Sequence, residues 1–136
     1  MRVLFDSNHF GHVHVFKHAI WVLGERGHSV PAASSERKVA TQLLRGYRIP
    51  FVSPGYPGGS IAAKGVRLAT SIMRLLPTGA RFSPDVLVGI SPVWAAPIAW
   101  LLRCPCVGLD DTDHAALSHR LYAPVADRLL APECHG

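Results

Sequence analysis

The chain has 136 residues, which is enough for one domain with a single hydrophobic core and too few for a two-domain enzyme. Apolar residues make up 49% of the sequence and charged residues 17%, so an intrinsically disordered chain is excluded as well. The net charge of +5 is unevenly distributed, because residues 37–81 hold eight basic side chains and no carboxylate, whereas residues 104–136 hold five acids and two arginines.

The predicted elements alternate between short apolar runs and helical segments, which is typical of an α/β domain with a parallel sheet. In chain order they are a strand at 3–6, a helix at 11–26, a strand at 29–33, a helix at 35–45, a strand at 49–53, a helix at 60–76, a strand at 85–90, a helix at 92–102, a strand at 106–109, a helix at 112–122 and a strand at 127–131. We expect a single Rossmann-like domain over 1–136 with a doubly wound parallel sheet of about six strands.

The cysteine usage and the apolar segments indicate where the protein resides. Three cysteines, two of them in Cys104-Pro105-Cys106, lack the spacing of a disulfide framework. Asp6 interrupts the first apolar run too early for a secretory signal. The longest uncharged stretch, residues 86–102, contains two prolines and is shorter than the roughly 20 residues that cross a bilayer. The sequence therefore predicts a cytoplasmic protein with reduced cysteines.

The first predicted helix is apolar along one side and carries two histidines on the other. The residues expected on the buried side are Val15, Phe16, Ala19, Ile20, Val22 and Leu23. His14 and His18 are four residues apart, a spacing that can hold a metal ion, but they share their side with lysine, tryptophan and glutamate and are expected to face solvent. No metal site is predicted.

The third predicted helix carries a basic stripe. Lys64, Arg67 and Arg74 fall in a narrow arc, and apolar residues including Val66 and Met73 fill the other side. A solvated face is the commoner explanation of such a stripe, and contact with anionic lipid headgroups is the alternative. Nucleic acid is not an expected partner, because no recognised nucleic-acid-binding motif accompanies these residues.

Polar residues and glycines follow four of the predicted strands. The carboxyl ends of parallel strands lie at one edge of a doubly wound sheet, where ligands bind, and the helices that begin there offer free N–H groups to an anion or a sugar hydroxyl. The residues expected to line this crevice are His9, Gly59, Ser60, Ser91, Asp110 and His114. No dinucleotide-binding or phosphate-binding glycine motif occurs, so NAD and ATP are disfavoured and no cofactor is expected.

Two groups at this edge are candidates for proton transfer. His12 is expected in the first turn of a helix, where an imidazole can accept a proton near neutral pH; simple packing beside the helix end is the alternative. The run Asp110-Asp111-Thr112-Asp113-His114 contains three carboxylates and an imidazole. One of the acids, or Thr112, is expected to cap a helix, which accounts for one or two of these groups. The others could orient sugar hydroxyls, act as a base or hold a divalent cation.

Five segments then carry a resemblance to a known family. They are residues 6–17, 27–30, 84–89, 110–115 and 130–133. In this order they resemble the N-terminal half of a prokaryotic glycosyltransferase-like family whose reaction is unassigned. That family is similar in fold to GT-B enzymes such as the lipid II N-acetylglucosaminyltransferase and to UDP-N-acetylglucosamine 2-epimerases. The resemblance extends over nearly the whole chain.

The resemblance implies the N-terminal lobe of a GT-B architecture, with a second lobe in cis or in trans. In GT-B transferases the N-terminal lobe largely holds the acceptor, and the C-terminal lobe holds most contacts with the nucleotide sugar. His12 matches the histidine that opens the first helix in these transferases, although the loop at 8–12 lacks their paired glycines. The acidic run is similar to a signature of the family itself.

The leading interpretation is the acceptor-side lobe of a glycosyltransferase that inverts a nucleotide-sugar donor and acts on a sugar or glycolipid acceptor. His12 is the expected general base, and Asp111 is its rival. A nucleotide-sugar epimerase lobe and a non-catalytic sugar- or membrane-binding module are the alternatives. The lone domain is expected to be inactive without a second lobe. It is expected at the membrane periphery if Lys64, Arg67 and Arg74 contact anionic lipid.

Overall fold

The structure is a computed structural model of the chain, and it describes residues 1–7, 9–34, 38–52, 61–110 and 116–131. Over these residues six strands alternate with five helices. The elements are β1 (Val3–Asp6), α1 (Phe10–Glu25), β2 (Ala32–Ala33), α2 (Lys38–Gly46), β3 (Phe51–Val52), α3 (Ile61–Phe82), β4 (Val86–Ile90), α4 (Ala95–Leu102), β5 (Cys106–Leu109), α5 (Ala116–Tyr122) and β6 (Arg128–Leu130). The predicted alternation of strands and helices is confirmed.

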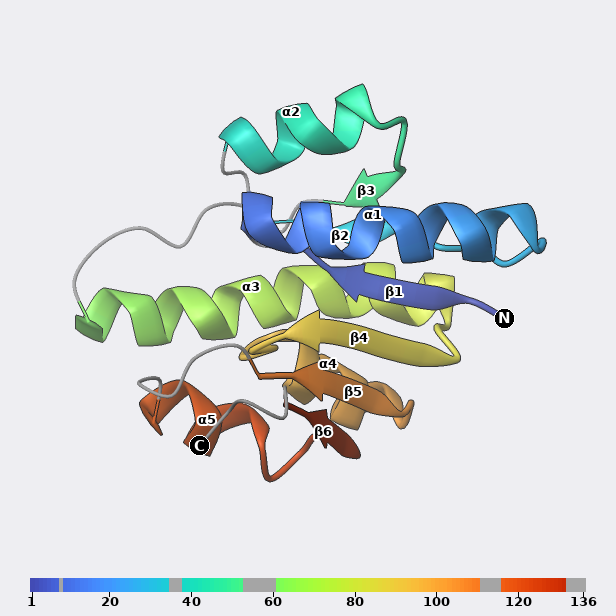
Figure 1. The fold of residues 1–136 in the computed structure, drawn as a ribbon. Helices are drawn as coiled ribbons and strands as arrows, with labels where there is room; N and C mark the ends of the chain where they lie inside the picture. The colour runs from blue at the N-terminus through green and yellow to red at the C-terminus, as the bar shows by residue number, and fades with distance from the viewer. Residues whose placement is uncertain (8, 35–37, 53–60, 111–115, 132–136) are drawn as a thin grey trace.

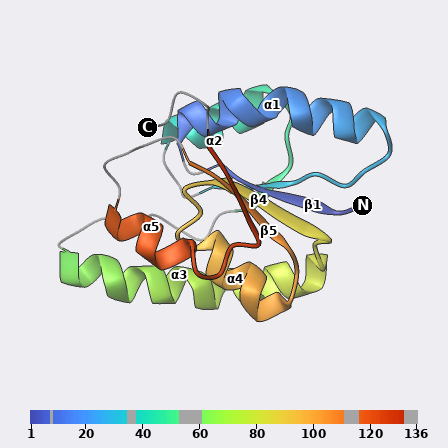
Figure 2. The ribbon, with the colours of Figure 1, turned by 60° about the horizontal axis from the view of Figure 1, so that its bottom comes forward.

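The strands form one parallel sheet in the order β3-β2-β1-β4-β5-β6. The chain therefore builds outward from β1 to β3, returns to pair β4 with β1, and continues outward on the other side. Helices α1 and α2 cover one face of the sheet, and α3, α4 and α5 cover the other (Figures 1 and 2). This arrangement confirms the predicted doubly wound, Rossmann-like fold.

The core has two parts because successive side chains of a strand point to opposite faces. On β1, Val3 and Phe5 point toward α1, where Phe5 contacts Phe16 with ring centroids 5.1 Å apart. Leu4 points to the opposite face and joins the cluster formed by α3 and α4. Both faces of the sheet are thus apolar, as parallel sheets covered on two sides require.

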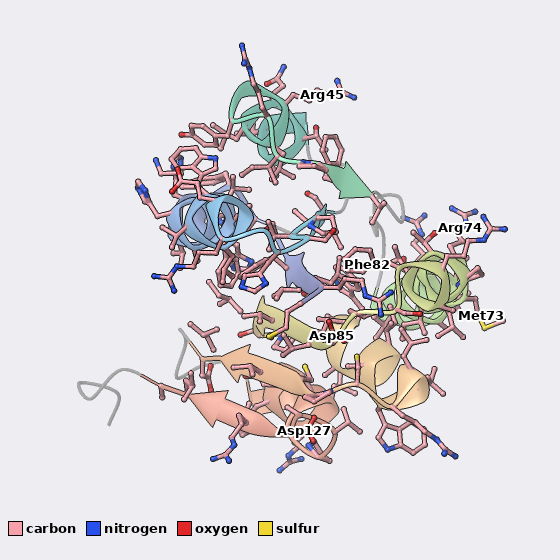
Figure 3. All side chains as sticks on the ribbon, turned by 90° about the vertical axis from the view of Figure 1, so that its right-hand side faces the viewer. Arg45, Met73, Arg74, Phe82, Asp85 and Asp127 are labelled. Carbon is pink, nitrogen blue, oxygen red and sulfur yellow. The ribbon has the colours of Figure 1, made fainter. Side chains whose placement is uncertain are left out.

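Two carboxylates hold the amino edge of the sheet together (Figure 3). The Asp85 carboxylate accepts a hydrogen bond from the backbone N–H of Arg2 at 2.7 Å, and Asp127 accepts one from Cys106 at 2.8 Å. Each aspartate precedes one strand and binds the start of its neighbour, so these acids have a structural role. At the opposite edge, Oδ1 of Asp110 has no hydrogen-bond partner among the described residues.

The predicted end of the third helix was wrong. The helix was predicted to end at about Leu76, but α3 continues through Pro77 to Phe82. Pro77 lies on the exposed side, whereas Leu75 and Gly79 are buried and Phe82 is half-buried on the opposite side. Burial of this continuing stripe against α4 compensates for the hydrogen bond that proline cannot donate.

The predicted buried side of the first helix was also partly wrong. Val13, Phe16 and Ile20 form the buried stripe of α1, whereas Val15 and Val22 are exposed. Apolar residues occur on more than one side of this helix, so the pattern alone does not select the packed side. Trp21 was predicted on the side of the helix that faces solvent. Its ring instead lies 5.6 Å from that of Tyr47, directly after α2.

Candidate functional site

The first residue after each of four neighbouring strands is a serine or an aspartate. These residues are Ser34 after β2, Ser7 after β1, Ser91 after β4 and Asp110 after β5. In each case the backbone N–H donates a hydrogen bond of 2.7–3.0 Å to the last residue of the next strand in the sheet. The sheet pairing therefore continues one step past the strands and holds the four residues along the carboxyl edge.

Three of these side chains carry buried polar atoms without partners. In the described part of the chain, Ser7 Oγ, Ser91 Oγ and Asp110 Oδ1 have almost no solvent contact and form no hydrogen bond. Buried polar groups are nearly always hydrogen-bonded, and an unsatisfied one costs roughly 1–3 kcal/mol. Three such atoms on adjacent strands indicate a place where a polar ligand or ordered water belongs.

Ser91 has an unusual backbone. Its φ of 45° lies in the left-handed region, which costs energy for residues other than glycine. Pro92 follows it and is buried against Gly89 and Gly108. These two glycines leave the space that a side chain would occupy, so the turn from β4 toward α4 stays close to the sheet and fixes Ser91 at its edge.

Two histidines lie at the beginning of α1. His9 caps the helix, because its Nδ1 accepts a hydrogen bond from the N–H of Gly11 at 3.2 Å. A neutral His9 therefore carries its proton on Nε2, where it can donate to a ligand. The ring of His12 lies 5.8 Å from that of His9 by centroids, and both residues are half-buried. Figure 1 shows α1 beginning at the edge toward which the strand arrows point.

The sequence did not single out His119 of α5. Its Nε2 lies 3.7 Å from Asp110 Oδ2, and its ring packs edge-on against that of Tyr122 at 5.4 Å. The Asp110 side chain is only 14% exposed, whereas His119 is 48% exposed. The structure thus pairs a largely covered carboxylate with an accessible imidazole. Nothing in the spacing of the two residues indicated this pair. Ser7 and Ser34 were missed too, although polar residues directly after strands were a usable signal.

The predicted site is described in part. His9, His12, Ser91 and Asp110 all lie at the carboxyl edge of the sheet, on α1 and at the ends of β4 and β5. Gly59, Ser60, Asp111 and His114 lie outside the described residues. Within the described ranges no group of three or more histidine, cysteine or acidic residues could hold a metal ion.

The two described cysteines are poor nucleophiles. The pKa of Cys106 is raised to about 12, mainly by burial, and the nearby charges of Cys104 and Asp127 contribute to this rise in the same direction. Burial also raises the pKa of Cys104. Only a thiolate attacks efficiently, and at neutral pH both groups are thiols. A cysteine-based mechanism at these positions is therefore disfavoured. Both cysteines also lie at the amino end of β5, which is the edge of the sheet opposite to the candidate residues.

The outer surface of α3 combines exposed apolar and basic residues. Val66 is 70% exposed and Met73 is 69% exposed, although both were predicted on the apolar side of the helix. Arg67 and Arg74 are exposed beside them. Met73 and Arg74 project outward from the helix in Figure 3. None of the helices in the described ranges is both long enough and apolar enough to span a bilayer.

Comparison with solved structures shows what this fold is similar to. MurG of Acinetobacter baumannii matches with a TM-score of 0.83 at 15% identity, over 98% of this chain and 42% of that chain. The UDP-GlcNAc 2-epimerase of Neisseria meningitidis, solved with UDP-GlcNAc, matches with a TM-score of 0.73 at 16% identity, over 97% and 40%. The spinosyn rhamnosyltransferase SpnG, solved with spinosyn aglycone, matches with a TM-score of 0.65 at 20% identity, over 89% and 38%.

The chain thus spans about two fifths of the length of these structures. No protein-family model matches the sequence, and no curated protein does. At identities of 15–20% the likeness concerns the fold. The six-stranded parallel sheet and its helices have the Rossmann-like fold of a lobe of the GT-B glycosyltransferases and the related UDP-GlcNAc 2-epimerase.

Proposed function

We propose that this domain is the acceptor-side lobe of a GT-B-like glycosyltransferase. The observation that supports this proposal is the set of buried polar atoms on Ser7, Ser91 and Asp110, which have no hydrogen-bond partner among the described residues and lie at the edge where α1 begins. Hydroxyl and carboxylate groups of this kind suit a sugar, whose hydroxyls both donate and accept hydrogen bonds. The structural neighbours include an enzyme solved with an acceptor aglycone and one solved with a nucleotide sugar.

In the proposed reaction, His12 takes the proton of the acceptor hydroxyl as that oxygen attacks the anomeric carbon of the donor sugar. The bond between this carbon and the nucleotide diphosphate breaks, and the configuration is inverted. His9 and Asp110 orient the acceptor through hydrogen bonds. The second lobe, in cis or in trans, supplies most contacts with the nucleotide and stabilises the departing diphosphate. Asp111 remains the rival base.

Sugar binding to this lobe is the direct test. N-Acetylglucosamine and its octyl glycoside, titrated into the 15N-labelled chain, are expected to shift the amide signals of Ser7, Gly11, Ser91 and Asp110. Asp110→Asn is expected to weaken binding about tenfold, because a hydrogen bond to a charged group is lost. Ser91→Ala is also expected to weaken sugar binding. Its matched control is Ser29→Ala, at the exposed amino edge, which should leave sugar binding unchanged.

Shifts confined to the amino edge, or no binding of any sugar, would count against the acceptor role. The epimerase alternative predicts a different pattern, because such an enzyme needs no separate acceptor. In that case UDP-GlcNAc would shift the same amide signals, and N-acetylglucosamine and its glycoside would not.

We also propose that α3 contacts the surface of an anionic membrane. This is the alternative that the sequence left open for the stripe of Lys64, Arg67 and Arg74. The exposed Val66 and Met73 favour this contact over simple solvation. Large apolar side chains beside arginines gain little from water, whereas at a membrane surface they can insert among the lipids. No acidic residue occurs between Glu36 and Asp85, so the stripe lacks neutralising partners within this stretch of sequence.

Vesicle sedimentation tests the membrane contact. Neutralising Lys64, Arg67 and Arg74 to glutamine is expected to weaken binding to phosphatidylserine-containing vesicles about 100-fold, at about 1 kcal/mol per basic residue. The control replaces Arg2, Arg26 and Arg45, which removes the same charge at sites outside α3. Equal losses in the two variants, or equal binding to neutral vesicles, would contradict a specific role for α3.

A further inference from the structure

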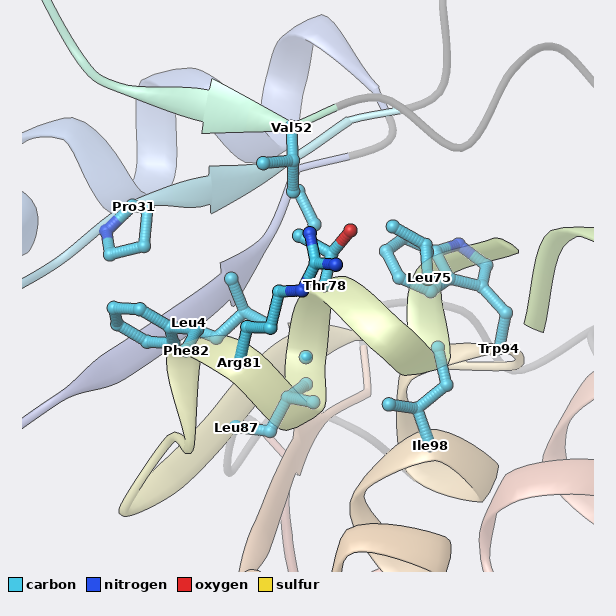
Figure 4. A pocket seen from close by; sticks show the side chains of 12 residues that line it. Leu4, Pro31, Val52, Leu75, Thr78, Arg81, Phe82, Leu87, Trp94 and Ile98 are labelled. Atoms are coloured by element: carbon cyan, nitrogen blue, oxygen red, sulfur yellow. The ribbon is translucent and has the colours of Figure 1, made fainter. Parts of the chain in front are cut away.

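A hollow lies between α3 and the sheet. Its volume is about 320 Å³. The floor is formed by Leu4, Ala33, Val52 and Leu87 from four adjacent strands, and the side wall by Leu75 and Phe82 of α3 with Trp94 and Ile98 (Figure 4). Nearly all of the lining surface is apolar. We call this hollow the α3 cavity.

The cavity arises from how α3 packs. At Gly79 the helix approaches α4 so closely that an added Cβ would lie 3.0 Å from Leu102 Cδ1. Helix α3 therefore lies beside α4, on the same face of the sheet (Figure 2). The strands present the short side chain of Ala33 there, which leaves the space empty.

The mouth of the cavity is cationic. Among the described residues of the lining, Arg81 and Thr78 carry the polar side chains and none is a carboxylate. Arg81 extends from α3 toward Val52 at the end of β3 in Figure 4. Its exposed guanidinium therefore stands beside an apolar interior, with Arg74 two turns earlier on the same helix. An anionic group joined to a hydrocarbon chain matches both features.

We propose that the α3 cavity binds the hydrocarbon chain of a single-chain anionic amphiphile, such as a long-chain fatty acid, with its carboxylate on Arg81. A cavity whose lining surface is almost entirely apolar favours an apolar ligand, and about 300 Å³ is the lower end of known ligand sites. The cavity does not include His9, His12, Ser91 or Asp110, so this binding is independent of the proposed sugar site.

Titration calorimetry with straight-chain carboxylates of six to fourteen carbons, below their micelle concentrations, tests the proposal. Affinity is expected to rise about fourfold per added methylene until the cavity is full and then to level off. Arg81→Gln should weaken carboxylate binding about tenfold and leave an alcohol of equal chain length unaffected. Arg67→Gln, on the same helix but outside the cavity, is the matched control.

Filling the cavity supplies the second arm of the test. Ala33→Leu adds bulk from β2, and Val52→Phe adds it from β3, so binding of every chain length should be lost in each. Two variants are used because either could perturb folding, and circular dichroism checks that the fold is retained. Absence of carboxylate binding, affinity independent of chain length, or binding retained in both folded variants would overturn the proposal.

Discussion

Replacement of His12 by alanine is expected to lower glycosyl transfer about 10²- to 10⁴-fold in the polypeptide or complex that carries both lobes, which is the usual contribution of a positioned general base. The imidazole lies in the first turn of α1, beside His9, at the edge where β1 and β4 end. Without it, the acceptor hydroxyl loses the group that takes its proton. Release of the nucleotide diphosphate under saturating acceptor measures the effect.

His14→Ala is the control for this experiment. His14 lies on the same helix but is exposed, and its ring stands 6.0 Å from that of Tyr47 on the side facing α2. Its loss should change turnover less than twofold. Full turnover in His12→Ala, combined with a large loss in Asp111→Asn, would move the role of base to the acidic segment. Loss in neither variant would remove both candidates.

The sequence predicted the order of the elements and the edge at which the candidate residues lie. The runs at 3–6 and 106–109 became β1 and β5 with the predicted bounds, because short apolar runs between turn residues leave few alternatives in an α/β chain. The edge followed from topology, since all parallel strands end on one side. His9, His12, Ser91 and Asp110 lie at this edge for the same reason, and their roles in binding and catalysis stay predictions.

Features that depend on tertiary packing could not be predicted from the sequence. The end of α3 was misplaced because the local effect of Pro77 is unfavourable to a helix, whereas burial of Leu75 and Gly79 against α4 acts at a distance. The pairing of Asp110 with His119 depends on how α5 returns over the sheet. The left-handed backbone of Ser91, a residue other than glycine, likewise depends on the seating of Pro92.

Gly89→Ala is expected to lower the free energy of unfolding by about 1–3 kcal/mol, the usual cost of overpacking a core. An added Cβ would lie 2.9 Å from the Cβ atoms of both Asp6 and Pro92. A Cβ is fixed to the backbone, so β1 or the turn after β4 must move. Urea denaturation measures the loss as a lower midpoint with an unchanged slope. Movement of Pro92 would also displace Ser91 and weaken sugar binding.

Two other glycines separate this effect from a general intolerance of alanine. Gly46→Ala in α2 meets no atom within 4 Å and should stabilise the protein by about 0.4–1 kcal/mol, because alanine restricts the unfolded chain. Gly108→Ala has a closer contact, 2.8 Å, but with Leu129 Cδ2, the tip of a flexible and exposed side chain. That tip can rotate away, so the loss should be smaller than for Gly89→Ala. A larger loss of stability in Gly108→Ala than in Gly89→Ala would contradict this explanation. It would mean that the contact distance alone sets the cost, and that Pro92 is not packed rigidly against Gly89.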